Sequence, residues 1–183
     1  AHRLIVYSRY AERLMREYAE GKYADRVRFV PHGIDAEILR PATDEERAGF
    51  RRKYFADWPE NAFICGMIAA NKGWPSRKSF PEAMEAFAML AQNHPEARLY
   101  LHSYPGVDFK GPPLQEMAQH FGIAEKVRIA NSNILIGGDY TDEMMREIYC
   151  SLDVLLSPSQ GEGFGLPIVE AQSCGTSVIV NDH

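Results

Sequence analysis

Two glutamates and a group of glycines lie in one short stretch near the C-terminal end of the sequence. Residues 157–171 read SPSQGEGFGLPIVEA, with Glu162 and Glu170 eight positions apart. Gly163 and Gly165 let the backbone approach a ligand closely, and the amides that follow them would point at it from a helix N-terminus. Because two carboxylates would repel a phosphate, we expect their partners to be hydroxyl groups, such as the vicinal diol of a ribose or a hexose.

Each glutamate also has an interpretation that needs no ligand. Glu170 would lie in the first turn of a helix beginning at Pro167, where an acidic side chain is stabilised by the helix dipole. Glu162 would be a solvated loop residue. The two glutamates together, at this spacing and with these glycines, favour a binding site.

A second loop carries positive charge. Lys72, Arg77 and Lys78 follow an apolar segment, residues 63–69, and precede a helical pattern from about Pro81. A diphosphate held between the two loops would meet cations on one side and helix-end amides on the other. Taken alone, this loop slightly favours the interpretation as a solvated basic turn.

Strand and helix patterns alternate along the chain and would position both loops. We predict strands at residues 4–7, 27–30, 63–69, 98–102, 127–130, 153–157 and 177–180, with helices between them. Such alternation is typical of a parallel sheet covered on both faces, and ligands bind such sheets at the carboxyl ends of the strands. We therefore predict an α/β fold with a Rossmann-like, doubly wound parallel sheet.

Composition excludes several other classes of protein. The chain has 183 residues, 45% of them hydrophobic, and a net charge of −5, so it is neither disordered nor suited to wrapping nucleic acid. No histidine or cysteine pair has the spacing of metal ligands, so we expect no metal site. The three scattered cysteines and the lack of a long apolar segment indicate a soluble protein of the cytoplasm.

The loop of residues 157–171 resembles a known family. The segment from Glu162 to Glu170 is similar to the E-x7-E motif of the family 4 glycosyltransferases, which are retaining enzymes of the GT-B fold. The flanking residues 149–154 (YCSLDV) and 170–180 (EAQSCGTSVIV) also resemble that family. So do the turn at residues 30–35 (VPHGID), which is similar to the interdomain turn, and the basic pair Arg77-Lys78.

The resemblance implies roles for particular residues. Arg77 and Lys78 would neutralise the donor diphosphate. Many members of the family carry an arginine where this chain has Met67, so one phosphate contact is either missing here or supplied by Lys72. Glu162 would be the catalytic residue, bound to the transferred sugar, and Glu170 would grip the ribose hydroxyls. The remaining donor-binding positions implied are Gly163, Phe164, Gly165, Leu166 and, near the nucleobase, Asn131.

The resemblance also implies a division of the chain. Residues 1–31 would be the end of an N-terminal acceptor domain and the interdomain connection, and residues 32–183 a donor-binding domain. The last strand, residues 177–180, has no covering helix after it, so we expect this domain to be incomplete at its C-terminus. With one wall of the interdomain cleft missing, we expect this piece to bind a nucleotide sugar without transferring it.

The implied activity is that of a hexosyltransferase that needs no bound metal and no cofactor. Its donor would be a UDP-, GDP- or ADP-sugar and its acceptor a sugar, a lipid or a protein. Peripheral membrane association of the intact enzyme is left open. One alternative is an NAD(P)-binding Rossmann domain of an oxidoreductase, because Gly161, Gly163 and Gly165 precede a helix and Asp182 follows about twenty residues on. Another alternative is a non-catalytic nucleotide-binding interaction module.

Overall fold

A computed structural model describes residues 2–106 and 110–182, which form two compact units. The smaller unit comprises residues 1–34 and 162–166, and the larger one residues 35–161 and 167–183. In the smaller unit, β1 (Leu4–Val6) and β2 (Val27–Phe29) pair in parallel, and α1 (Arg9–Glu17) connects them through two short 3-10 turns. Ser8 begins α1, because its hydroxyl accepts a hydrogen bond from the Ala11 amide at 3.0 Å.

The larger unit is built on a five-stranded parallel sheet in the order β5-β4-β3-β6-β7. Its strands are β3 (Phe63–Ile68), β4 (Ala97–His102), β5 (Val127–Ile129), β6 (Val154–Ser157) and β7 (Ser177–Val180). The chain runs outward from β3 to β5 and then returns to the other side of β3. This reversal makes the gap between β3 and β6 the topological switch point.

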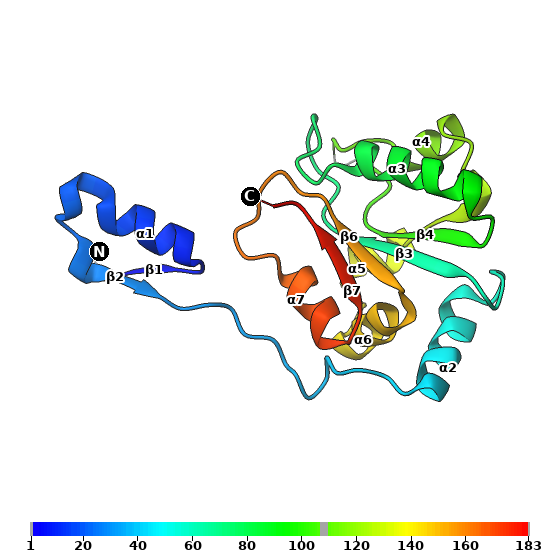
Figure 1. The fold of residues 1–183 in the computed structure, drawn as a ribbon, viewed down its shortest axis with the longest axis horizontal. Coiled ribbons are helices and arrows are strands. Elements are labelled where there is room, and N and C mark those ends of the chain that lie inside the picture. Colours follow the sequence, from blue (N-terminus) through cyan, green and yellow to red (C-terminus); the bar gives the residue numbers. More distant parts are fainter. Residues whose placement is uncertain (1, 107–109, 183) are drawn as a thin grey trace. The chain divides into compact units, whose positions relative to one another are not determined.

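Helices cover both faces of this sheet. They are α2 (Asp44–Phe55), α3 (Phe80–Asn93), α4 (Leu114–His120), α5 (Ser132–Gly137), α6 (Asp142–Ser151) and α7 (Leu166–Ser173). In Figure 1, α3 and α4 lie on one side of the sheet, with α6 and α7 on the other. The connections change face because right-handed crossovers in opposite directions along a sheet put their helices on opposite sides. The predicted α/β, doubly wound architecture is confirmed.

Helix α5 was not expected from the sequence. It has six residues, too few for a clear period in the apolar pattern, and it depends on a cap. The Asn131 side-chain oxygen accepts hydrogen bonds from the amides of Asn133 and Ile134, at 3.0 and 3.4 Å. Gly138, with φ of +74°, ends the helix.

The apolar core lies between the middle strands and the helices α3 and α4. Apolar side chains of these elements are removed from solvent, among them Met67, Phe80, Met84, Leu99, Leu101 and Leu114. On β3, Gly66 has no room for a side chain, because an added Cβ would lie 2.2 Å from a methyl carbon of Leu152. The central strands are therefore closely packed against their neighbours, and the loops at their carboxyl ends begin from fixed positions.

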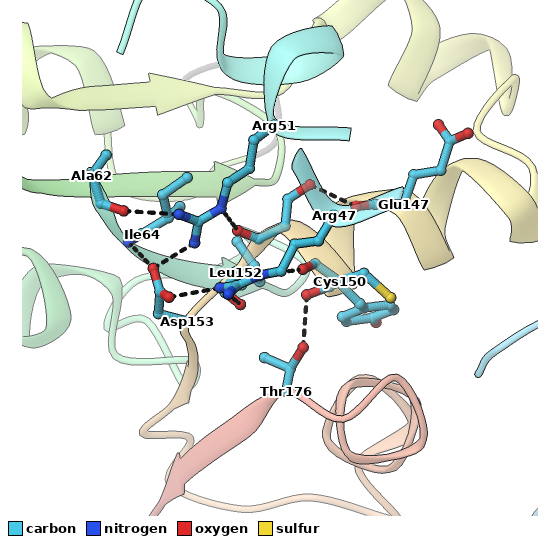
Figure 2. A network of polar contacts seen from close by, with 11 residues as sticks. Arg47, Arg51, Ala62, Ile64, Glu147, Cys150, Leu152, Asp153 and Thr176 are labelled. Atoms are coloured by element: carbon cyan, nitrogen blue, oxygen red, sulfur yellow. Dashed lines mark hydrogen bonds and ion pairs between the residues drawn. The ribbon is translucent and has the colours of Figure 1, made fainter. Parts of the chain in front are cut away.

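A polar network ties α2 to the start of β6, as Figure 2 shows. The Asp153 carboxylate accepts hydrogen bonds from Arg47 at 2.6 Å, from Arg51 at 2.7 Å and from the Ile64 amide at 2.7 Å. The two guanidinium groups also donate to the carbonyl groups of Cys150, Ser151 and Leu152 at the end of α6. These carbonyls have no partner within the helix, so the two arginines act as its C-terminal cap.

Candidate functional site

The loops that follow β3 and β6 meet at the switch point of the sheet. Because β3 and β6 are parallel neighbours, with Gly66 beside Leu155, their carboxyl ends open at the same edge. The loop after β3 contains the three predicted cations. The loop after β6 leads into the glycine-rich segment, residues 162–166. Within the larger unit, the basic loop therefore lies beside residues 158–161, the first part of the predicted loop.

Arg77 holds the two loops together. Its guanidinium donates to the Gly161 carbonyl and, at 3.3 Å, to the hydroxyl of Ser159. The Gln160 amide in turn donates to the Arg77 carbonyl at 2.9 Å. Ser159 is buried, and its carbonyl accepts a hydrogen bond from the Asn181 side chain at 3.0 Å. These contacts fix the path of the backbone as it enters the glycine-rich segment.

The loop between β3 and α3 contains buried polar atoms. Asn71 is fully buried, and its amide nitrogen donates to the carbonyls of Tyr104 and Pro112, at 3.1 and 2.8 Å. Within the described part of the chain, Asn71 Oδ1 and the Ser76 hydroxyl have no hydrogen-bond partner. Buried polar atoms are nearly always paired, so these two atoms are positioned to hydrogen-bond water or a ligand.

The three predicted cations differ in exposure. Lys72 and Arg77 are exposed, whereas Lys78 is half-buried directly before the start of α3. Ser79, the N-cap residue of that helix, has φ of +56°, a conformation that is costly for a residue with a side chain. Met67 is buried in the core and offers no polar group to this loop.

The glycine-rich segment, residues 162–166, groups with the smaller unit. Glu162 and Gly163 are exposed, and Gly165 has φ of +85°, in the region that favours glycine. The Phe164 ring meets the ring of His32 edge to face at 5.2 Å, and His32 also lies 4.2 Å from the Tyr7 ring. Leu166, which is exposed, is the first residue of α7.

Glu170 does not lie in the first turn of its helix, so that expectation was wrong. Helix α7 begins at Leu166, one residue before Pro167, and its first turn contains no acidic residue. Proline is tolerated there because its missing N–H would have no partner within the helix. Glu170 therefore gains little from the helix dipole. Its carboxylate oxygen Oε2 accepts a hydrogen bond of 2.6 Å from the hydroxyl of Tyr149.

The end of β4 contains a polar cluster that the sequence analysis missed. The Tyr100 hydroxyl and His102 Nδ1 are hydrogen-bonded at 2.8 Å, and the Tyr140 ring meets the His102 ring edge to face at 4.5 Å. Burial lowers the pKa of His102 to about 4. Tyr100 and His102 lie two positions apart on one face of β4 and fit no motif. Only the tertiary structure brings the Tyr140 ring, from the segment between α5 and α6, against His102.

Two further findings concern metals and membranes. Among residues 2–106 and 110–182, no group of three or more histidine, cysteine or acidic side chains is arranged to hold a metal ion. None of the described helices has the length and apolar content needed to cross a membrane.

Comparison with known proteins gives a family match over most of the larger unit. Residues 64–183 match the model of the family described as glycosyl transferases group 1. This match decides against the alternative of a dinucleotide-binding oxidoreductase.

Curated relatives are similar at moderate identity. The chain is 26% identical over 163 residues to the mannosylfructose-phosphate synthase of Agrobacterium fabrum, covering 86% of this chain and 33% of that protein. It is 30% identical over 166 residues to the D-inositol 3-phosphate glycosyltransferase of Acidothermus cellulolyticus, covering 87% of this chain and 34% of that protein. The chain thus spans about a third of the length of these relatives.

Solved structures share the fold. The C-terminal domain of the glycosyl transferase LpcC from Francisella tularensis aligns with a TM-score of 0.60 at 22% identity, covering 81% of this chain and 70% of that one. HepE from Anabaena, in complex with UDP and glucose, aligns with a TM-score of 0.69 at 20% identity, covering 98% of this chain and 44% of that one. The five-stranded unit therefore has the architecture of the C-terminal half of a GT-B fold.

Proposed function

This chain belongs to the group 1 glycosyl transferases, and from that membership we propose that it carries the donor-binding part of a retaining enzyme. The enzyme transfers a sugar from a nucleoside diphosphate to an acceptor. The observation that carries the proposal is the junction of two loops at the switch point, joined by Arg77. Ligands of open α/β sheets bind at this place.

The basic loop would bind the diphosphate. Lys72 and Lys78 supply positive charge beside the N-terminus of α3, where helix amides also favour an anion. Arg77 adds a third charge and, through its bonds to Ser159 and Gly161, orders the opposite loop. The unpaired polar atoms of Asn71 and Ser76 support a ligand or ordered water in this region.

The remaining roles follow the family motif. Glu162 would act on the transferred sugar, and Glu170 would bind the ribose hydroxyls. The segment Gly163, Phe164, Gly165 and Leu166 would offer backbone amides to sugar and phosphate oxygens. Asn131 would lie near the nucleobase; because its side-chain oxygen caps α5, its own contact would come from its amide nitrogen or its backbone.

For the whole protein, we propose that residues 1–31 belong to the acceptor domain and the interdomain connection, and residues 32–183 to the donor-binding domain. UDP and glucose are bound by HepE, which makes a UDP-hexose the first donor to test here. The three cysteines are free and buried, which supports a reducing compartment such as the cytoplasm. The acceptor is a sugar, a lipid or a protein.

The proposal is tested by calorimetric titration of the chain with UDP, GDP, ADP and NAD. We expect one of the nucleoside diphosphates to bind, and NAD not to bind. Lys78→Ala should weaken binding by about 1.5–3 kcal/mol, because it removes one charge-assisted contact. Lys126→Ala is the control: Lys126 precedes the amino end of β5, at the opposite edge of the sheet, and should have no effect on affinity.

Failure of UDP, GDP and ADP to bind the wild type at millimolar concentration would refute the donor site. Equal affinity of the wild type and Lys78→Ala would refute the role of the basic loop. Diphosphate binding by the complete protein without any transfer would favour the non-catalytic interaction module.

A further inference from the structure

We propose that Tyr149 is a positioning residue for Glu170, and that its hydroxyl orients the carboxylate that binds the ribose. The inference rests on the proposed function and extends it to a residue outside the E-x7-E motif. The Tyr149 hydroxyl donates to Glu170 Oε2 at 2.6 Å, a short bond of the kind made to a charged acceptor. Tyr149 lies on α6 and Glu170 on α7, so one helix orients a side chain of the next.

Tyr149 is itself held in place. Its side chain is fully buried, which limits the ring to one position in the packed interior. Its carbonyl accepts hydrogen bonds from the Thr176 hydroxyl at 2.7 Å and from the Leu152 amide at 3.1 Å. Figure 2 shows Thr176, at the start of β7, in this network. The donor to Glu170 is therefore anchored through both its ring and its backbone.

The bond restricts the conformations of the carboxylate. A glutamate on a helix surface samples several rotamers, and restricting it before a ligand arrives lowers the entropic cost of binding. Burial and the neighbouring Glu170 raise the pKa of Tyr149. Its hydroxyl therefore stays protonated, and remains a hydrogen-bond donor, at physiological pH.

The position of Glu170 suits this role. It is the fifth residue of α7, so it lies about 6 Å along the axis from the start of that helix. That distance puts it one turn beyond the loop that leaves the carboxyl end of β6. Oxygen Oε2 accepts from Tyr149, and the hydroxyls of a ribose would meet the same carboxylate from the side of that loop.

The chain offers a matched control at a second tyrosine. Tyr54, on α2, donates to Glu147 Oε2 on α6, also at 2.6 Å. Both bonds run from a tyrosine hydroxyl to a glutamate carboxylate and have the same length, and Glu147 Oε2 also pairs with Lys53 at 2.5 Å. Glu147 is not part of the proposed donor site. Tyr54→Phe therefore reports what removing such a bond does to stability alone.

The experiment measures preference for the ribose. The wild type, Tyr149→Phe, Glu170→Gln and Tyr54→Phe are titrated with whichever of UDP, GDP and ADP binds, and with its 2′,3′-dideoxy counterpart. We expect the wild type to prefer the ribonucleotide about tenfold, as one charge-assisted hydrogen bond would give. Tyr149→Phe should reduce this preference to about threefold or less by weakening ribonucleotide binding alone, and Tyr54→Phe should keep it.

Each other outcome overturns the inference. If Tyr149→Phe keeps the preference of the wild type, Tyr149 has only a structural role, while the proposed function stands. If the wild type binds the diphosphate with no preference for ribose, Glu170 does not bind the hydroxyls, and the donor site stands without it. If the wild type binds no nucleoside diphosphate, the proposed function and this inference fail together.

A second measurement covers the case in which Tyr149→Phe does not fold. In the wild type labelled at tyrosine 13Cζ, the Tyr149 resonance is the one most displaced by Glu170→Gln. It should shift when the ribonucleotide binds, and less when the dideoxynucleotide binds, because only the ribose competes for the same carboxylate. A Tyr149 resonance that responds equally to both ligands overturns the inference.

Discussion

His102 shows how a single residue can be constrained by its surroundings. It ends β4, is almost completely buried, and packs between the hydroxyl of Tyr100 and the ring of Tyr140. Burial disfavours the charged imidazolium and lowers the pKa of His102 to about 4, compared with 6.5 for an ordinary histidine. The side chain is therefore neutral over the whole physiological range.

This pKa predicts a pH dependence of stability. Between pH 6.5 and about 4 the unfolded state binds a proton at His102 that the folded state does not bind, so stability falls as the pH falls. Between pH 7 and pH 4.5 the decrease from this group is about 2–3 kcal/mol. Urea denaturation at both pH values should show a smaller decrease for His102→Gln than for the wild type. The exposed His120, changed to Gln, is the control, and equal decreases for the wild type and His102→Gln would contradict the prediction.

At the scale of elements, the end of α6 depends on a helix far away in sequence. Arg47 and Arg51 of α2 bond to its last carbonyls and to Asp153, which also holds the Ile64 amide of β3. The network thereby fixes the start of β6 and the end of the helix that carries Tyr149. This network lies at the amino ends of β3 and β6, and the loops of the proposed donor site leave the carboxyl ends of the same two strands.

Asp153→Asn should weaken this support. It removes the charge that neutralises two arginines, so we expect a decrease of about 2–4 kcal/mol in the free energy of unfolding. For a chain of this size the melting temperature should fall by about 5–10 °C. Asp57→Asn is the matched control: Asp57 pairs with Arg128 but its side chain is 70% exposed, so its removal should cost less than about 1 kcal/mol. Equal effects of the two changes would show that the Asp153 network stabilises the fold no more than an exposed ion pair does.

At the scale of the whole molecule, the chain contains one large unit and one small unit. The small unit combines residues 1–34 with the glycine-rich segment that carries Glu162. The large unit contains the basic loop, Glu170 and Tyr149. The chain spans about a third of its curated relatives, so the groups that bind the acceptor are expected elsewhere in the complete protein.

The 183-residue chain should therefore bind a donor nucleotide without transferring its sugar. Transfer needs an acceptor held against the reacting carbon, and positioning of this kind accounts for a large part of catalysis. The measurement is release of nucleoside diphosphate from UDP-, GDP- and ADP-sugars in the presence of sugar and lipid acceptors, with calorimetry to confirm binding. Turnover near the usual range for enzymes, about 1 s⁻¹ or faster, would contradict this expectation.

Local patterns in the sequence were enough to predict the architecture. Apolar residues repeat with different periods in strands and in helices, so the two kinds of element can be distinguished in the sequence. Their regular alternation along the chain predicts a parallel sheet. Ser8 and Thr141 mark helix starts, since their hydroxyls pair with amides only three residues on. The E-x7-E motif and the basic loop are likewise short segments that can be recognised in a single sequence. The short helix α5 was missed because six residues hold less than two turns of pattern.

The partners of the functional residues were decided only by the tertiary structure. Tyr149 and Glu170 are 21 positions apart, Arg77 and Gly161 are 84 apart, and Arg47 and Asp153 are 106 apart. Such pairs depend on the order of the strands in the sheet, which places β6 beside β3 rather than beside β5. Hydrogen bonds require approach to about 3 Å, and no local pattern specifies which distant residues will come that close. The sequence by itself therefore determined the family and the candidate residues of the donor site. The packing of α6, α7 and α2 on the sheet decided which distant side chains contact them.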